Sequence, residues 1–160
     1  MPWVGRSRGG LSTKTHMAVD GRGRPLAIRL TPGQAGDNPE LIPVLSAIDV
    51  PTGHRPRCRP NVVIADKAYS HPSTRTALRR KGIKTVIPER SDQKAHRKTR
   101  GRAGGRPPAF DADLYKQRNV VERGFNRLKQ WRGVATRYDK KARNYRAGII
   151  LAAVILCWLP

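Results

Sequence analysis

Two acidic residues stand where a carboxylate can do chemistry. Asp66 directly follows the apolar run NVVIA, residues 61–65, and Glu122 lies within the segment NVVERGF. A short β-branched run of this kind is typical of a strand buried on both faces, and open α/β sheets place their ligand sites at the carboxyl ends of such strands. Hard divalent cations prefer oxygen ligands. Asp66 is therefore a candidate metal ligand, and the alternative interpretation is a cap of the turn ADKAYS.

Glu122 shares one line of a predicted helix with an aromatic hydroxyl and two cations. At about 100° per residue, the side chains that fall on this line are those of Tyr115, Arg118, Glu122 and Lys129. An adjoining apolar stripe favours a helix with one buried face. The alternative is a solvated face on which Arg118 and Glu122 pair at i, i+4, which is worth a few tenths of a kcal/mol.

The spacing of these four residues matches a known signature. Tyr115, Arg118, Glu122 and Lys129 follow the pattern Y-(2)-R-(3)-E-(6)-K, and the chain resembles insertion-sequence transposases of the family-four and family-five groups. The resemblance also covers GRSRGGLSTKTHMAVDGRGRPLAIRLTPGQAGD, VIADKAYSH and GGRPPAFDADLYKQRNVVERGFNRLKQWRGVATRYDK, so it spans nearly the whole chain.

The resemblance implies a DNA-cutting and DNA-joining enzyme with an RNase H-like α/β fold, in which helices flank a mixed sheet. It implies one catalytic domain over residues 1–160 and a DDE triad that holds two Mg²⁺ or Mn²⁺ ions. Asp66 resembles the second aspartate and Glu122 the glutamate of that triad. The residues expected to contact DNA are Tyr115, Arg118, Lys129, Lys67 and Arg132.

The first aspartate of the triad has no counterpart in this sequence. It is expected on an N-terminal strand before the hairpin, but the chain begins MPWVGRSRGG, so we expect that strand to be missing. Asp20 falls in a predicted turn and Asp37 in a loop, and a compensating role for Asp37 stays open. We therefore expect little activity from this chain alone, as a frameshift product or a decayed copy, and a polypeptide from an upstream reading frame as a partner.

The periodicity of the sequence predicts a mixed series of strands and helices. We expect a β-hairpin over residues 11–31, a helix after Asn38, parallel strands over 61–65 and 83–87 joined by a helix over 72–81, a basic flexible loop over 90–109, one helix from Asp111 or Asp113 to just before Gly133, and an apolar final helix over 147–159. Trp131 and Trp158 are expected in the core, and the four histidines are expected to be structural or exposed.

The composition favours a polyanionic partner. A net charge of +22 and a pI near 11.5 produce a strongly positive potential. We expect double-stranded DNA, as transposon ends and target, and by resemblance a homo-oligomer. No membrane is expected, because the apolar run AGIILAAVILCWL falls short of the ~20 residues of a membrane span. No secretory signal is apparent, which favours the cytoplasm. A non-catalytic basic DNA-binding protein or repressor of transposition remains the alternative.

Overall fold

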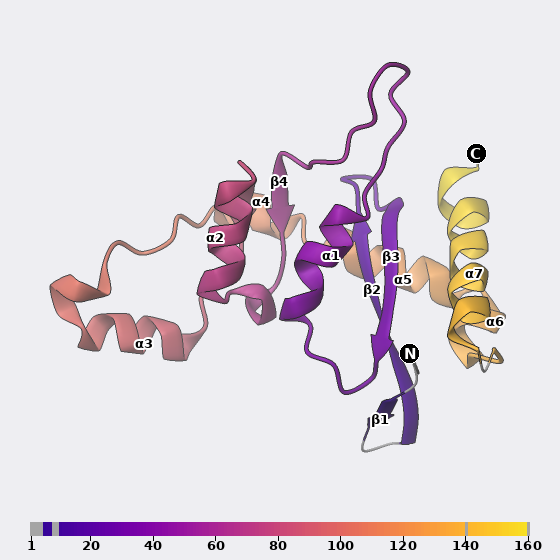
Figure 1. Cartoon of the computed structure of the whole chain (residues 1–160), viewed down its shortest axis with the longest axis horizontal. Helices are drawn as coiled ribbons and strands as arrows, with labels where there is room; N and C mark the ends of the chain where they lie inside the picture. Colours follow the sequence, from indigo (N-terminus) through magenta and orange to yellow (C-terminus); the bar gives the residue numbers. More distant parts are fainter. Residues whose placement is uncertain (1–4, 8–9, 140, 160) are drawn as a thin grey trace. The chain divides into compact units, whose positions relative to one another are not determined.

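The structure, a computed structural model, describes residues 5–7, 10–139 and 141–159 (Figure 1). The chain forms two compact units, of which unit 1 comprises Met1–Arg59 and Asn119–Pro160 and unit 2 comprises Pro60–Arg118. Each unit combines strands with helices, which confirms the predicted α/β class. The RNase H-like arrangement, its missing strand and the single catalytic domain stay predictions.

The predicted hairpin forms the sheet of unit 1. The hairpin strands are β2 (Gly10–Val19) and β3 (Pro25–Pro32), and a further strand, β1 (Gly5–Ser7), pairs with β2, so the antiparallel order is β1-β2-β3. Asp20 shapes the turn, because its Oδ1 accepts hydrogen bonds from the backbone N–H groups of Arg22 and Arg24, both at 2.9 Å. Gly23 supplies the positive φ of 84° that closes the turn.

The helices of unit 1 are η1 (Asn38–Glu40), α1 (Leu41–Ser46), α5 (Asn119–Lys129), α6 (Arg132–Thr136), α7 (Ala142–Ala153) and a π-helical turn, η4 (Val154–Trp158). The helix predicted after Asn38 begins at Asn38 itself as the 3-10 turn η1, so Asn38 is its first residue and not its cap, and Pro39 is the second residue. The final helix begins at Ala142, earlier than predicted, because the polar residues before Ala147 continue the helix. No helix in the described part of the chain is long and apolar enough to cross a membrane.

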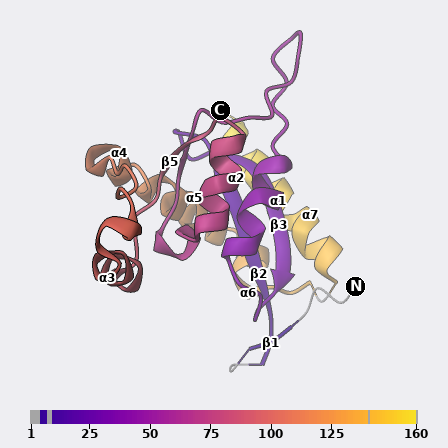
Figure 2. The same cartoon turned by 60° about the vertical axis from the view of Figure 1, so that its left-hand side comes forward.

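The core of unit 1 joins β3 to helices from the far end of the sequence. Its buried members are Ile28, Leu30, Leu128, Ile149, Ala152 and Ala153. Helix α7 packs along β3, as Figures 1 and 2 show. Two side chains from the C-terminal helices donate hydrogen bonds to backbone carbonyl groups of β3. Arg146 Nε donates to the carbonyl of Ile28 and Trp158 Nε1 to that of Pro25, each at 3.1 Å.

The prediction that both tryptophans lie in the core is wrong. The exposed fractions are 38% for Trp131 and 42% for Trp158. Trp158 lies at the edge of the sheet with the Arg24 guanidinium 4.5 Å from its ring centroid, so one face of the indole is covered by a cation.

Unit 2 contains the predicted parallel pair of strands. Strands β4 (Val62–Ile64) and β5 (Lys84–Val86) are joined through η2 (Lys67–Tyr69) and α2 (Pro72–Arg80), and they pair parallel. Gly82 ends the helical segment with a φ of 67°, as its position predicts. Helix α2 packs on β5, and Figure 2 shows the two side by side.

Residues 90–109, predicted as a basic loop, contain a helix. This is α3 (Ser91–Thr99), and a short turn η3 (Gly101–Gly104) follows it. No described residue of α3 is buried, so its stability comes from polar contacts. The Gln93 side chain accepts a hydrogen bond from the Arg90 backbone N–H at 3.3 Å, and Arg97 forms an ion pair with Glu89. The sequence prediction failed because it relied on apolar periodicity.

The prediction of a single helix from Asp111 or Asp113 to just before Gly133 is also wrong. The structure has α4 (Ala112–Lys116) and then α5, and the turn Gln117–Arg118 separates them. In this turn the backbone N–H of Gln117 donates to Leu114 O at 3.1 Å, and that of Arg118 to Tyr115 O at 2.9 Å. These i to i−3 bonds tighten the chain and end the α-helix.

Gly124 allows α5 to lie close against the hairpin. A Cβ atom at this position would lie 3.2 Å from Met17 Cε and 3.3 Å from the carbonyl oxygen of Gly23. We expect Gly124→Val to destabilise the protein by about 1–3 kcal/mol through overpacking, which lowers the Tm by about 2–10 °C. Gly148→Val in α7 is the control, because the nearest atom there is Asp139 Oδ2 at 3.8 Å. Equal Tm values for the two variants would contradict the close approach.

His16 is a buried titratable residue of unit 1, and we expect it to make the unit sensitive to acid. His16 is 5% exposed, and its Nε2 is hydrogen-bonded to Thr31 Oγ1 at 2.7 Å. Burial lowers the pKa of His16 below 6.5, and the charges of Asp37 and Glu40 only partly offset this effect. Because the folded pKa is the lower one, the stabilisation is present above the unfolded pKa and is lost as the pH falls through it.

We therefore expect the Tm to fall between about pH 7 and about pH 5 and His16→Gln to reduce that fall. The glutamine amide keeps a polar partner for Thr31 but does not titrate. Tm values measured across this range check the prediction, and parallel pH profiles for the two proteins would contradict it.

Candidate active site

Asp66 lies at the carboxyl end of β4, where the sequence predicted a functional carboxylate. The backbone leaves the strand in an extended conformation, and Asp66 Oδ1 accepts a hydrogen bond from the Ala68 N–H at 2.8 Å as the cap of η2. The capping interpretation is therefore confirmed. A carboxylate has about four acceptor sites, and Oδ2 has no hydrogen bond with the described residues. The cap thus leaves acceptor capacity for a ligand.

Glu122 lies in the first turn of α5 with an exposed side chain. The helix dipole stabilises a negative charge at this end of a helix. Val121 is half-buried and Leu128 is 2% exposed, so α5 has the predicted apolar stripe beside the line of Glu122. Lys129 lies two turns further on at the other end of α5, and it lines a cavity of about 450 Å³ with residues of β2 and α7.

The other two signature residues belong to a different segment. Tyr115 is in α4 and Arg118 in the turn after it, with the Arg118 guanidinium 6.0 Å from the Tyr115 ring centroid. Because the helix is broken at this turn, the four signature residues do not lie on one continuous helix. Lys67 and Arg132 are both exposed, at the first positions of η2 and α6.

The two aspartates considered as substitutes for the first triad member have local structural contacts. Asp20 holds the hairpin turn, and Asp37 Oδ1 lies 3.0 Å from Lys14 Nζ. Burial raises the pKa of Asp20, but hydrogen bonds from Arg24 and Arg22 outweigh this effect, so the pKa lies below its usual value. The structure shows both carboxylates engaged with cations, and a metal-binding role for Asp37 stays untested.

The two-metal site stays a prediction. Among the described residues there is no group of three or more His, Cys, Asp or Glu side chains placed to hold a metal ion. Asp66 belongs to unit 2 and Glu122 to unit 1. Their oxygen donors suit Mg²⁺ or Mn²⁺ chemically.

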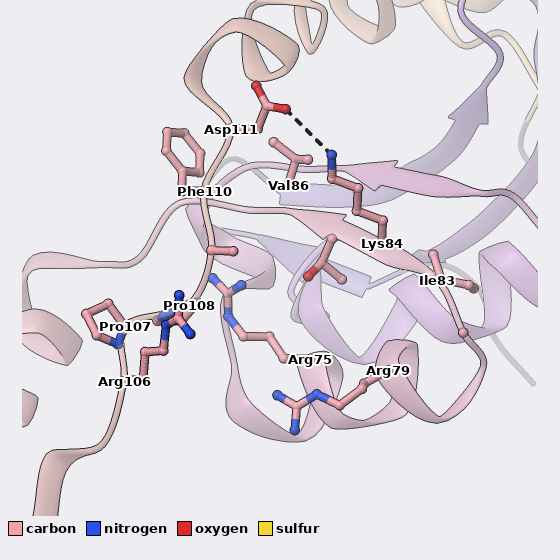
Figure 3. Close-up of a pocket in the computed structure, with 13 residues that line it drawn as sticks. Arg75, Arg79, Ile83, Lys84, Val86, Arg106, Pro107, Pro108, Phe110 and Asp111 are labelled. Atoms are coloured by element: carbon pink, nitrogen blue, oxygen red, sulfur yellow. Dashed lines mark ion pairs between the residues drawn. The ribbon is translucent and has the colours of Figure 1, made fainter.

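Unit 2 has a basic groove that the sequence analysis missed. Its volume is about 1000 Å³, and its walls are α2, β5 and residues 106–111 (Figure 3). The charged residues that line it are Arg75, Arg79, Lys84, Arg106 and Asp111. These side chains come from three separate stretches of sequence, so no spacing rule connects them.

Comparison with known proteins identifies the family. The chain belongs to the family described as the transposase DDE domain, whose match covers residues 3–157. It is 35% identical over 148 residues to a putative transposase for insertion sequence element IS402 from Burkholderia cepacia, which covers 91% of this chain and 63% of that relative. It is 33% identical over 153 residues to a putative transposase for insertion sequence element IS6501 from Brucella ovis, covering 93% of this chain and 99% of that relative.

The chain therefore spans less than two thirds of the IS402 relative and nearly all of the IS6501 relative. No solved structure is significantly similar to the chain. The resemblance to bacterial insertion-sequence transposases is confirmed, while the assignment to the family-four and family-five groups stays a prediction.

The signature cations can be tested through the salt dependence of DNA binding. Each phosphate neutralised on duplex DNA contributes a slope of about −0.9 to the plot of log affinity against log salt. We expect Arg118→Ala and Lys129→Ala each to reduce the magnitude of the slope by about one unit. Fluorescence anisotropy with a labelled duplex at several salt concentrations measures the slope. An unchanged slope in both variants would support the solvated-face interpretation.

Proposed function

We propose that this protein acts in DNA transposition, as the part of a DDE transposase that cleaves and joins phosphodiester bonds. The observation that carries the proposal is Asp66, which follows β4 of a parallel pair in a chain of the transposase DDE family. In a protein that bound DNA by charge alone, this carboxylate would serve only as the cap of η2. The coarser conclusion, a transposase family member, does not depend on this assignment.

In this proposal Asp66 and Glu122 are metal ligands, and the third carboxylate is assigned to no residue of this chain. Two divalent cations, when bound, activate a water or a 3′-hydroxyl and stabilise the leaving oxygen. The positive side chains of Arg118, Lys129 and Lys67 hold the negatively charged backbone of DNA, since cations near phosphates supply most of the affinity.

The partners follow from the same chemistry. Double-stranded DNA, as transposon ends and target, suits a net charge of +22. We further propose a homo-oligomer and a polypeptide that supplies the first aspartate, in the cytoplasm. The first aspartate is expected upstream because the resemblance to the family places it on a strand before the hairpin.

The metal ligands can be tested in a protein that carries the upstream strand and its aspartate. We expect Asp66→Asn and Glu122→Gln each to abolish Mg²⁺-dependent DNA cleavage while DNA affinity stays unchanged or rises slightly. Both substitutions keep the shape of the side chain and remove a charge that binds a cation. Asparagine also keeps the oxygen that accepts from the Ala68 N–H, so the cap of η2 survives.

Asp113→Asn is the matched control. Its carboxylate is 91% exposed, and its one ion pair among the described residues is with Lys116, three residues away on the same helix. This variant loses the same charge and should cleave DNA at the parental rate. Parental cleavage by Asp66→Asn or Glu122→Gln would disprove the assignment of that residue.

A further inference from the structure

The groove of unit 2 concentrates positive charge on two facing walls. Figure 3 shows Arg75 and Arg79 on α2 and Arg106 on the segment that faces them. Arg79 and Arg106 form no ion pair with any of the described residues, so neither is neutralised by a neighbouring carboxylate. Such an arrangement attracts an anion that can contact both walls.

Arg75 has a structural task instead. Its Nη2 donates a hydrogen bond to the carbonyl of Ile87 at 2.7 Å, which ties α2 to the residue after β5. Burial lowers the pKa of Arg75, although the charge of Glu89 opposes this effect. Arg75 therefore positions the wall of the groove, and the ligand contacts fall to Arg79 and Arg106.

The only carboxylate that lines the described groove lies at one end. Asp111 Oδ2 is 3.6 Å from Lys84 Nζ, and both side chains are more than 40% exposed (Figure 3). The backbone N–H of Leu114 donates to Asp111 at 2.9 Å. This bond, together with the charge of Lys84, lowers the pKa of Asp111. Asp111 is consequently charged at neutral pH and repels an anion from that end of the groove.

An aromatic side chain completes the groove. Phe110 lines it and is 46% exposed, which is unusual for a ring with no charge or hydroxyl. The ring lies 5.2 Å from that of Tyr115, so a second aromatic group supports it. Cations along a groove combined with an exposed ring are the features that bind single-stranded nucleic acid, because an unpaired base can stack on the ring. The bases of an intact duplex are already stacked on one another.

We propose that this groove binds a single-stranded segment of DNA, with phosphates on Arg79 and Arg106 and an unpaired base on Phe110. This proposal rests on the proposed function in one respect, which is that the bound nucleic acid is DNA. It assigns a site that the metal-dependent chemistry of Asp66 and Glu122 does not include.

The test measures binding of a fluorescein-labelled oligothymidylate of about 12 nucleotides to the 160-residue chain in EDTA. We expect Arg79→Ala and Arg106→Ala each to weaken binding about three- to tenfold at low salt and to reduce the magnitude of the salt slope by about 0.7. Phe110→Ala should weaken binding at least about fivefold, and Phe110→Tyr should restore it, because stacking needs only the ring.

Two control variants separate the groove from the general charge of the protein. The controls are Arg80→Ala and Arg102→Ala. Arg80 is next to Arg79 on α2 and Arg102 is in η3, but neither side chain lines the groove. Each removes one positive charge and should change affinity less than its groove counterpart. All these positions are exposed, and equal Tm values confirm that each variant folds.

Equal losses in the groove variants and their controls would overturn the proposal. If Phe110→Ala weakens binding to a duplex of the same length as much as it weakens binding to the single strand, the single-strand assignment is overturned. Because EDTA removes divalent cations, these binding results are independent of DNA cleavage. Loss of cleavage in Asp66→Asn is therefore no evidence that the groove binds DNA, and binding in the groove is no evidence for the metal ligands.

Discussion

The packing of α7 against β3 is the contact on which unit 1 depends. Ala152 and Ala153 are 0% and 4% exposed, and such small side chains let the helix approach the sheet closely. The contact also buries Ile28 and Leu30 with Leu128 of α5. The same core therefore holds α5, which carries Glu122 and Lys129, against the hairpin. Hydrogen bonds from Arg146 and Trp158 add a polar cover to the edge of β3, which would otherwise expose carbonyl groups for pairing.

Charge is the second constraint on this protein. With 33 basic and 11 acidic residues, one-to-one pairing leaves 22 cations without an acidic partner. The local carboxylates are used for specific purposes: Asp20 shapes the hairpin turn, Asp111 begins α4 and Glu89 pairs with Arg97. Surface ion pairs stabilise little, so these contacts matter more for geometry than for net stability. Repulsion among the remaining positive charges opposes the compact state, and a bound polyanion would reduce this repulsion.

The sequence predicted those elements whose signal is local and apolar. Alternation identified the hairpin, and the run NVVIA together with Pro72 and Gly82 identified the parallel pair and placed Asp66 at its end. The break at Gln117–Arg118 left no such signal, because both residues favour helices and the turn is defined only by its i to i−3 hydrogen bonds. Helix α3 was missed because polar contacts hold it. The basic groove was missed because α2, β5 and residues 106–111 meet only in the folded unit.

The path of the chain through the two units affects how the protein is made. Unit 2 is one continuous stretch, Pro60–Arg118, whereas unit 1 joins Met1–Arg59 to Asn119–Pro160. During translation the hairpin leaves the ribosome before unit 2, and its packing partner α7 leaves only after unit 2. Unit 2 can fold in the interval, while the apolar side chains of β3 stay uncovered until α7 emerges. Strands that lack their packing partner are where nascent chains aggregate or recruit chaperones, so we expect the yield of folded protein to depend on elongation speed and chaperone supply.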